Sequence, residues 1–165
     1  MSAENTEHKL EVTIRCNDVS KLIISTYVLR LAIQAFKCCK EAKRIEIDSE
    51  HKLSYGGGER KLDFLVTCHS ENKEKMIAVE ISDDIYRLIG QCVLPLLMKL
   101  DTLAIYINKS LSKLLESETH KITLCDKTEN ELCKDLEKTL SHIDFFRNIL
   151  KPEYSKLIHV GVIYA

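Results

Sequence analysis

Stretches in which apolar and polar residues alternate recur along this chain, and such alternation is typical of β-strands that bury one face. The densest of them, residues 52–82, predicts three strands joined by two tight connections, an antiparallel meander. Gly56, Gly57 and Gly58 occupy the first connection, and the strand-like residues after them favour a hairpin turn over a phosphate-binding loop. The other strands are predicted at residues 10–14, 44–48, 102–107, 121–125 and 157–164.

Three longer stretches have the spacing of helices. The first, residues 19–42, is apolar over more than the roughly 100° arc of an ordinary surface helix, so we expect it to be covered on two sides. The second follows residues 82–84, which suit an N-cap, and is ended or kinked by Pro95. The third opens with a capping box at residues 128–131 and stops at Pro152.

The order of these elements predicts the fold class. Strand, long helix, four strands, helix, two short strands, long helix and closing strand indicate an α+β fold with a mainly antiparallel sheet and helices packed against it. The closing strand is apolar on both faces except at His159, so we expect it to be central or covered. At 165 residues the chain is predicted to form one domain, residues 10–165, after a flexible segment at residues 1–9.

Composition narrows the class of protein. The net charge of −1 predicts no global attraction to nucleic acid or anionic lipid, and no apolar run reaches the roughly 20 residues of a membrane span. The first ten residues are polar and lack the apolar core of a secretory signal. We therefore expect an intracellular protein, nuclear or cytoplasmic and not secreted, whose cysteines are free thiols. The seven cysteines are Cys16, Cys38, Cys39, Cys68, Cys92, Cys125 and Cys133.

Metal and cofactor motifs are missing from the sequence. It contains no C-x-x-C, no paired-histidine motif and no dinucleotide-binding signature, so we expect no cofactor. Cys38 and Cys39 are adjacent near a helix end, where successive side chains point about 100° apart, so the pair indicates neither a disulfide nor a shared metal site. A zinc site assembled from residues distant in the sequence stays open as an alternative.

One pair of acidic residues supports a sharper hypothesis. Asp on one strand and Glu-x-Lys on the next form the metal-binding core of one large nuclease fold, in which two carboxylates bind Mg²⁺ and the lysine orients water. Asp63 and Glu80 match the carboxylates. The third position is Ser82, so Lys75 or Lys99 would have to substitute for the lysine. The simpler interpretation places both carboxylates on the solvent face of an antiparallel strand.

Two functions remain open. Two broad apolar helices and a covered final strand offer more hydrophobic surface than one small sheet hides, which favours a non-enzymatic subunit of an intracellular multiprotein assembly. Another protein or a second copy would bind helix faces or a sheet edge. The alternative is a nuclease-like domain, active or degenerate. The basic residues between positions 37 and 61 support it only in part, because acidic residues interleave with them. The predicted partner-binding residues are Leu22, Leu29, Ile33, Phe36, Leu136, Leu140, Ile143 and Phe146.

Overall fold

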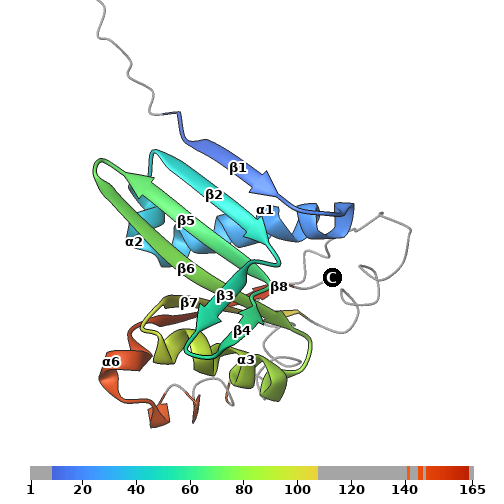
Figure 1. The fold of residues 1–165 in the computed structure, drawn as a ribbon, viewed down its shortest axis with the longest axis vertical. Helices are drawn as coiled ribbons and strands as arrows, with labels where there is room; N and C mark the ends of the chain where they lie inside the picture. Colours follow the sequence, from blue (N-terminus) through green and yellow to red (C-terminus); the bar gives the residue numbers. More distant parts are fainter. Residues whose placement is uncertain (1–8, 108–140, 142–144, 147, 164–165) are drawn as a thin grey trace, which may run out of the picture.

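The structure, a computed structural model, describes residues 9–107, 141, 145–146 and 148–163. Within these residues six strands form a mixed sheet, and a two-stranded hairpin packs on one of its faces (Figure 1). The strand predicted at residues 121–125 and most of the helix predicted from residue 129 lie outside the described residues. In sheet order the strands are β1 (Glu11–Arg15), β2 (Arg44–Ser49), β5 (Phe64–Ser70), β6 (Lys73–Ser82), β7 (Asp101–Ile107) and β8 (Ile158–Ile163), and the hairpin consists of β3 (Lys52–Tyr55) and β4 (Gly58–Lys61).

Helices cover the two faces of the sheet. Alternate residues of a strand point to opposite faces. Val79 and Ile105 therefore pack in the same core cluster as the first helix, whereas their neighbours Ala78 and Ala104 face the other side. No helix in the described ranges is long and apolar enough to cross a membrane. The helices are α1 (Val19–Ala35) and α2 (Lys37–Lys40) between β1 and β2, α3 (Ile85–Leu97) between β6 and β7, and α6 (Pro152–Ser155) before β8.

The α+β class is confirmed, but the prediction of a mainly antiparallel sheet is wrong. β2–β5 and β5–β6 are antiparallel, whereas β1–β2, β6–β7 and β7–β8 are parallel. A helix joins β1 to β2 and another joins β6 to β7, and each returns the chain to the same end of the sheet before the next strand begins. β8 is the last strand in the sheet order and not a central one, although Ile158 and Ile163 are buried.

The helix predicted over residues 19–42 is interrupted at Phe36. The backbone there is extended, with φ −116° and ψ 124°, and α2 starts at the next residue. Phe36 is buried as a result, and its ring meets that of His159 edge-on with the ring centroids 4.7 Å apart. The interruption also directs α2 onto β5, where Cys39 joins the core.

Candidate functional site

The candidate site lies where the chain passes from the hairpin to the main sheet. The meander predicted over residues 52–82 is interrupted there, because β4 ends at Lys61 and β5 begins at Phe64. Two backbone hydrogen bonds fix the passage: Leu62 N–H donates to the His51 carbonyl at 2.8 Å, and Glu50 N–H donates to the Asp63 carbonyl at 2.9 Å. Asp63 thus occupies a two-residue gap between two sheets.

Asp63 is placed beside the middle of β6 by strand register. Phe64 pairs with Val79, so the preceding residue, Asp63, comes opposite Glu80. The Asp63 carboxylate turns back into the sheet, and its Oδ2 accepts the Ile81 backbone N–H at 2.7 Å. This bond caps the end of the β5–β6 ladder, so the side chain has a defined position rather than a solvated one.

Glu80 is buried, and its predicted place on a solvent face is wrong. Its side chain is 1% exposed because α3 and the hairpin cover the face of β6 to which it points. Its Oε1 atom has no hydrogen bond. Among the described residues Arg60 on β4 brings an opposite charge to it, with its Nη2 atom 3.8 Å from Oε1. A buried carboxyl group with so little compensation is costly to ionise.

The surroundings of Glu80 favour its protonated form. Burial raises the pKa of Glu80 to about 8; the charge of Asp63 and a hydrogen bond with it act in the same direction, and Arg60 opposes them. Cys92 on α3 belongs to the same environment, since burial and the charge of Glu80 raise the pKa of its thiol to about 12. Glu80 therefore carries a proton at neutral pH.

A pocket of about 310 Å³ opens on the other side of Asp63, under the beginning of α1. Asp18 caps α1 by accepting the Lys21 backbone N–H at 2.7 Å, and Glu50 accepts a hydrogen bond from the Lys21 ammonium. That ammonium lowers the pKa of Glu50. The pocket thus combines three carboxylates and one ammonium group. Its lining residues are Asp18, Ser20, Lys21, Ile24, Glu50, Asp63, Phe64, Ile81 and Ile107.

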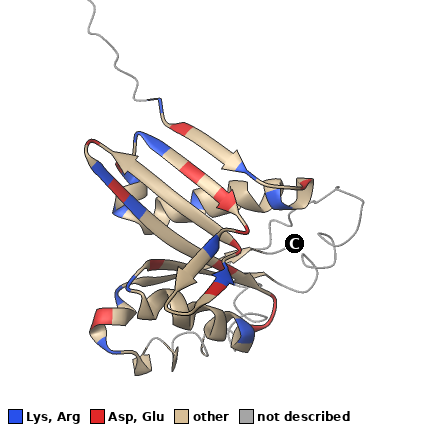
Figure 2. Ribbon diagram, viewed as in Figure 1, with Lys and Arg blue, Asp and Glu red and all other residues tan. Residues whose placement is uncertain are grey.

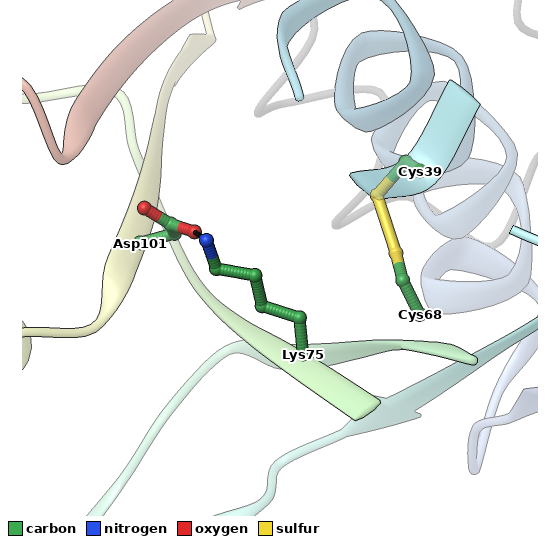
Figure 3. Close-up of a disulfide and its surroundings, with 4 residues drawn as sticks. All are labelled: Cys39, Cys68, Lys75 and Asp101. Carbon is green, nitrogen blue, oxygen red and sulfur yellow. Dashed lines mark ion pairs between the residues drawn. A yellow bond between two sulfur atoms is a disulfide. The ribbon is translucent and has the colours of Figure 1, made fainter. Parts of the chain in front are cut away.

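The structure does not bring either predicted substitute lysine to the carboxylate pair. Lys75 forms an ion pair with Asp101 at 3.2 Å, towards the other end of β6 (Figure 3). Lys99 follows α3 with a positive φ of 58°. Ser82 accepts the Asp84 backbone N–H at 3.1 Å and is nearly buried. The lysine that shares a pocket with Asp63 is Lys21, which sequence reasoning missed because 42 positions separate the two residues.

The predicted partner-binding residues fall into three groups. Leu22 is 44% exposed on α1, whereas Leu29 and Ile33 are half-buried against the core of the chain. Phe36 and Phe146 are buried within the chain itself. The other three, Leu136, Leu140 and Ile143, lie outside the described residues.

The expectation that all cysteines are free thiols is wrong for two of them. Cys39 on α2 and Cys68 on β5 form a disulfide with Cα atoms 5.6 Å apart (Figure 3). The 29 residues between them conceal this proximity in the sequence, because only the fold lays α2 on β5. Cys16, Cys38 and Cys92 are free, and Cys125 and Cys133 lie outside the described residues.

Charges of both signs are mixed over the described surface (Figure 2). Arg15 pairs with Asp48 at 2.9 Å, and Lys43 pairs with Glu71 at 2.5 Å. Exposed pairs of this kind contribute little stability but leave no single-signed field over the strands.

Comparisons with protein-family models, with curated proteins and with solved structures found no match to the chain.

Proposed function

We propose that this domain binds a divalent cation between Asp63 and Glu80 and acts, in the manner of a nuclease, on phosphodiesters. The observation that carries the proposal is the Glu80 carboxyl group, which is 1% exposed, lies opposite Asp63 and has an oxygen without a hydrogen bond. Native proteins seldom bury an oxygen of this kind without a use for it, because its desolvation costs about 1–3 kcal/mol.

Oxygen chemistry supports a hard cation at this position. Mg²⁺ and Mn²⁺ prefer carboxylate oxygens, and Mg²⁺ is commonly held by one or two carboxylates together with phosphate groups of a substrate. Arg60 supplies positive charge to the pair in the structure described here, from 3.8 Å. Its side chain is partly exposed, so it can turn outwards when a cation takes over the charge of Glu80.

Lys21 supports a phosphodiester as the substrate. It lines the pocket next to Asp63, and its ammonium group supplies a positive charge that a phosphate oxygen would meet. The nuclease pattern has a lysine at the position of Ser82. In this proposal Lys21 performs the role of that lysine. A cation on Asp63 would supply Lewis acidity and an activated water molecule.

A measurement of cation affinity distinguishes this proposal from the alternative that Asp63 and Glu80 have a purely structural role. Asp63→Asn keeps an oxygen for the Ile81 N–H, and Glu80→Gln keeps the neutral form, so both variants are expected to fold. We expect wild type to bind one Mn²⁺ and each variant to lose about tenfold or more in affinity. The matched control is Glu74→Gln, an exposed acid on the same strand. Equal Mn²⁺ affinity in all four proteins would contradict the proposal.

Catalysis needs its own assay. We expect Mn²⁺-dependent cleavage of a mixture of single- and double-stranded DNA and RNA, abolished in Asp63→Asn and reduced by about tenfold or more in Lys21→Met. Lys52→Met on the hairpin is the control for loss of one exposed positive charge. Cation binding without cleavage would mean a degenerate, non-catalytic member of this functional class.

A second candidate function is a non-enzymatic subunit that binds another protein. The specific observation is an apolar surface on the outer side of α3, where Val93 and Leu97 are exposed. The segment around Phe146 packs on α3 and adds the exposed side chains Phe145 and Ile149. An apolar helix of a partner protein suits a surface of this chemistry and shape.

Affinity purification of the tagged chain from its source cells tests this candidate. Leu97→Asp should abolish co-purification of a stoichiometric partner. Leu22→Asp, on the exposed part of α1, should leave co-purification unchanged. Loss with Leu22→Asp alone would move the interface to α1. A monodisperse monomer at micromolar concentration with no co-purifying protein would contradict the subunit function.

A further inference from the structure

A second group of side chains with metal-binding chemistry lies at the other end of the sheet. Cys38 and Cys39 are adjacent on α2, and Cys68 is on β5 directly beneath. The three Sγ atoms all lie within 4.8 Å of one another. Cys39 and Cys68 are buried and Cys38 is partly exposed. One turn of helix packed on one strand therefore gathers three sulfur atoms at a point that solvent reaches from one side.

The separation of the sulfur atoms suits a tetrahedral soft cation. Zn–S bonds of about 2.3 Å place two thiolates of a tetrahedral site about 3.8 Å apart. Sulfur atoms already within 4.8 Å of one another need only small side-chain adjustments to reach that spacing. The expectation that the adjacent cysteines offer no shared metal site does not hold here, because the Sγ atoms of Cys38 and Cys39 both lie within 4.8 Å of that of Cys68. Three soft donors select Zn²⁺ over Mg²⁺ or Ca²⁺.

This cluster is separate from the carboxylate pair. Cys68 and Asp63 are five residues apart in the sequence, about 16 Å in an extended strand. The charged groups that act on the Cys38 thiol are the Asp101 carboxylate and the Lys75 ammonium, which pair with each other at 3.2 Å on neighbouring strands (Figure 3). Because Lys75 already holds Asp101, a water molecule is the expected fourth ligand of an ion on the three sulfur atoms.

We propose that Cys38, Cys39 and Cys68, once reduced, form a three-thiolate Zn²⁺ site, and that oxidation to the Cys39–Cys68 disulfide releases the ion. A dithiol reductant gives the disulfide two electrons and two protons and becomes a disulfide itself. A phosphine gives two electrons and becomes the phosphine oxide, while one water molecule supplies its oxygen and the two protons. Either reaction turns the Cys39–Cys68 disulfide into two thiols. Zn²⁺ then binds three thiolates, and the three thiols release three protons to solvent. Oxidation by a disulfide oxidant removes two electrons from Cys39 and Cys68, re-forms their bond and leaves Cys38 as the only remaining ligand.

The first experiment follows metal uptake by the full chain. The protein is reduced with a phosphine without oxygen and titrated with Cd²⁺, whose thiolate complexes absorb in the ultraviolet, and Zn²⁺ affinity is then measured by competition with a chromophoric chelator. We expect one ion per reduced chain and none for the disulfide form. Cys38→Ser and Cys68→Ser should each weaken Zn²⁺ binding by about tenfold or more, whereas Cys16→Ser, a free cysteine outside the cluster, should not.

Two outcomes would overturn the proposal. One is no uptake by the reduced wild type. The other is Zn²⁺ affinity that is unchanged in Cys38→Ser but lost in the double variant Cys125→Ser, Cys133→Ser, which would place the ion elsewhere. Cys38→Ser keeps both cysteines of the disulfide, so its oxidised form is expected to fold like wild type, and circular dichroism of that form separates loss of binding from loss of fold.

Discussion

The guanidinium group of Arg60 lies 3.8 Å from the carboxyl group of Glu80, and that carboxyl group is 1% exposed. Arg60 comes from the hairpin and Glu80 from the central sheet, so this contact joins the two sheets. Asp63 also neighbours Glu80, and its charge raises the pKa of Glu80, whereas that of Arg60 lowers it. Burial and Asp63 together favour the protonated form of Glu80 and Arg60 opposes them, and a bound cation would favour ionisation.

Glu80 should make the stability of the protein fall as pH rises. Its pKa of about 8 in the folded chain exceeds the usual 4.5, so its contribution is fully present below pH 4.5 and is lost as pH rises through 8. The free energy of unfolding should decrease by up to about 1.4 kcal/mol per pH unit in this window. Glu80→Gln should remove that slope in chemical denaturation, while Glu74→Gln should retain it. A difference between wild type and Glu80→Gln that is independent of pH would refute the assignment.

Removing Arg60 should matter most at high pH. Arg60→Met takes away the charge that lowers the pKa of Glu80, so that pKa should rise further. Ionised Glu80 would then lack compensation, and we expect a loss of about 1–3 kcal/mol at pH 9 and a smaller one at pH 6. Lys61→Met, the exposed neighbour on the same strand, is the control. If the two variants behave alike at both pH values, Arg60 does not serve Glu80.

Packing of β8 against α1 should show as coupling between Gly161 and Leu31. A Cβ atom at Gly161 would lie 2.7 Å from the Leu31 Cδ1 atom, so Gly161→Ala should cost about 1–3 kcal/mol. Leu31→Ala makes room for the methyl group, so Gly161→Ala should cost about 1 kcal/mol less in that background. Urea denaturation of the four proteins of this double-mutant cycle measures the coupling. Strict additivity would show that Leu31 moves aside at no cost.

Local features of the fold could be predicted from the sequence, because local physics determines them. Asp18 and Asp84 cap the helices that follow them, each through hydrogen bonds to backbone N–H groups. Alternation located β1 and β2, and apolar, β-branched runs located β7 and β8, to within about two residues. Pro95 was predicted to end or kink its helix; α3 does not end there but continues two residues further, to Leu97.

The candidate site could not be predicted, because it depends on contacts between distant segments. The apolar residues around Asp63 predict one continuous strand. The pairing of β4 with β3 interrupts that strand, and the sequence pattern does not indicate that β4 and β5 lie in separate sheets. Glu80 points to the opposite face from Val79 and Ile81, and the sequence interpretation took its face to be solvent. The hairpin and α3 bury it instead. Lys21 lines the same pocket as Asp63 only because α1 packs on the other face of the sheet.

Proton release on cation binding tests the central claim most directly. Calorimetric titration of the wild type with Mn²⁺ at pH 7, in buffers of different ionisation enthalpy, counts the protons displaced. Because Glu80 has a pKa of about 8, binding through its carboxylate should release close to one proton per ion. Glu80→Gln should release none and bind more weakly. Mn²⁺ binding without proton release, or no binding by the wild type, would contradict a cation site at Asp63 and Glu80.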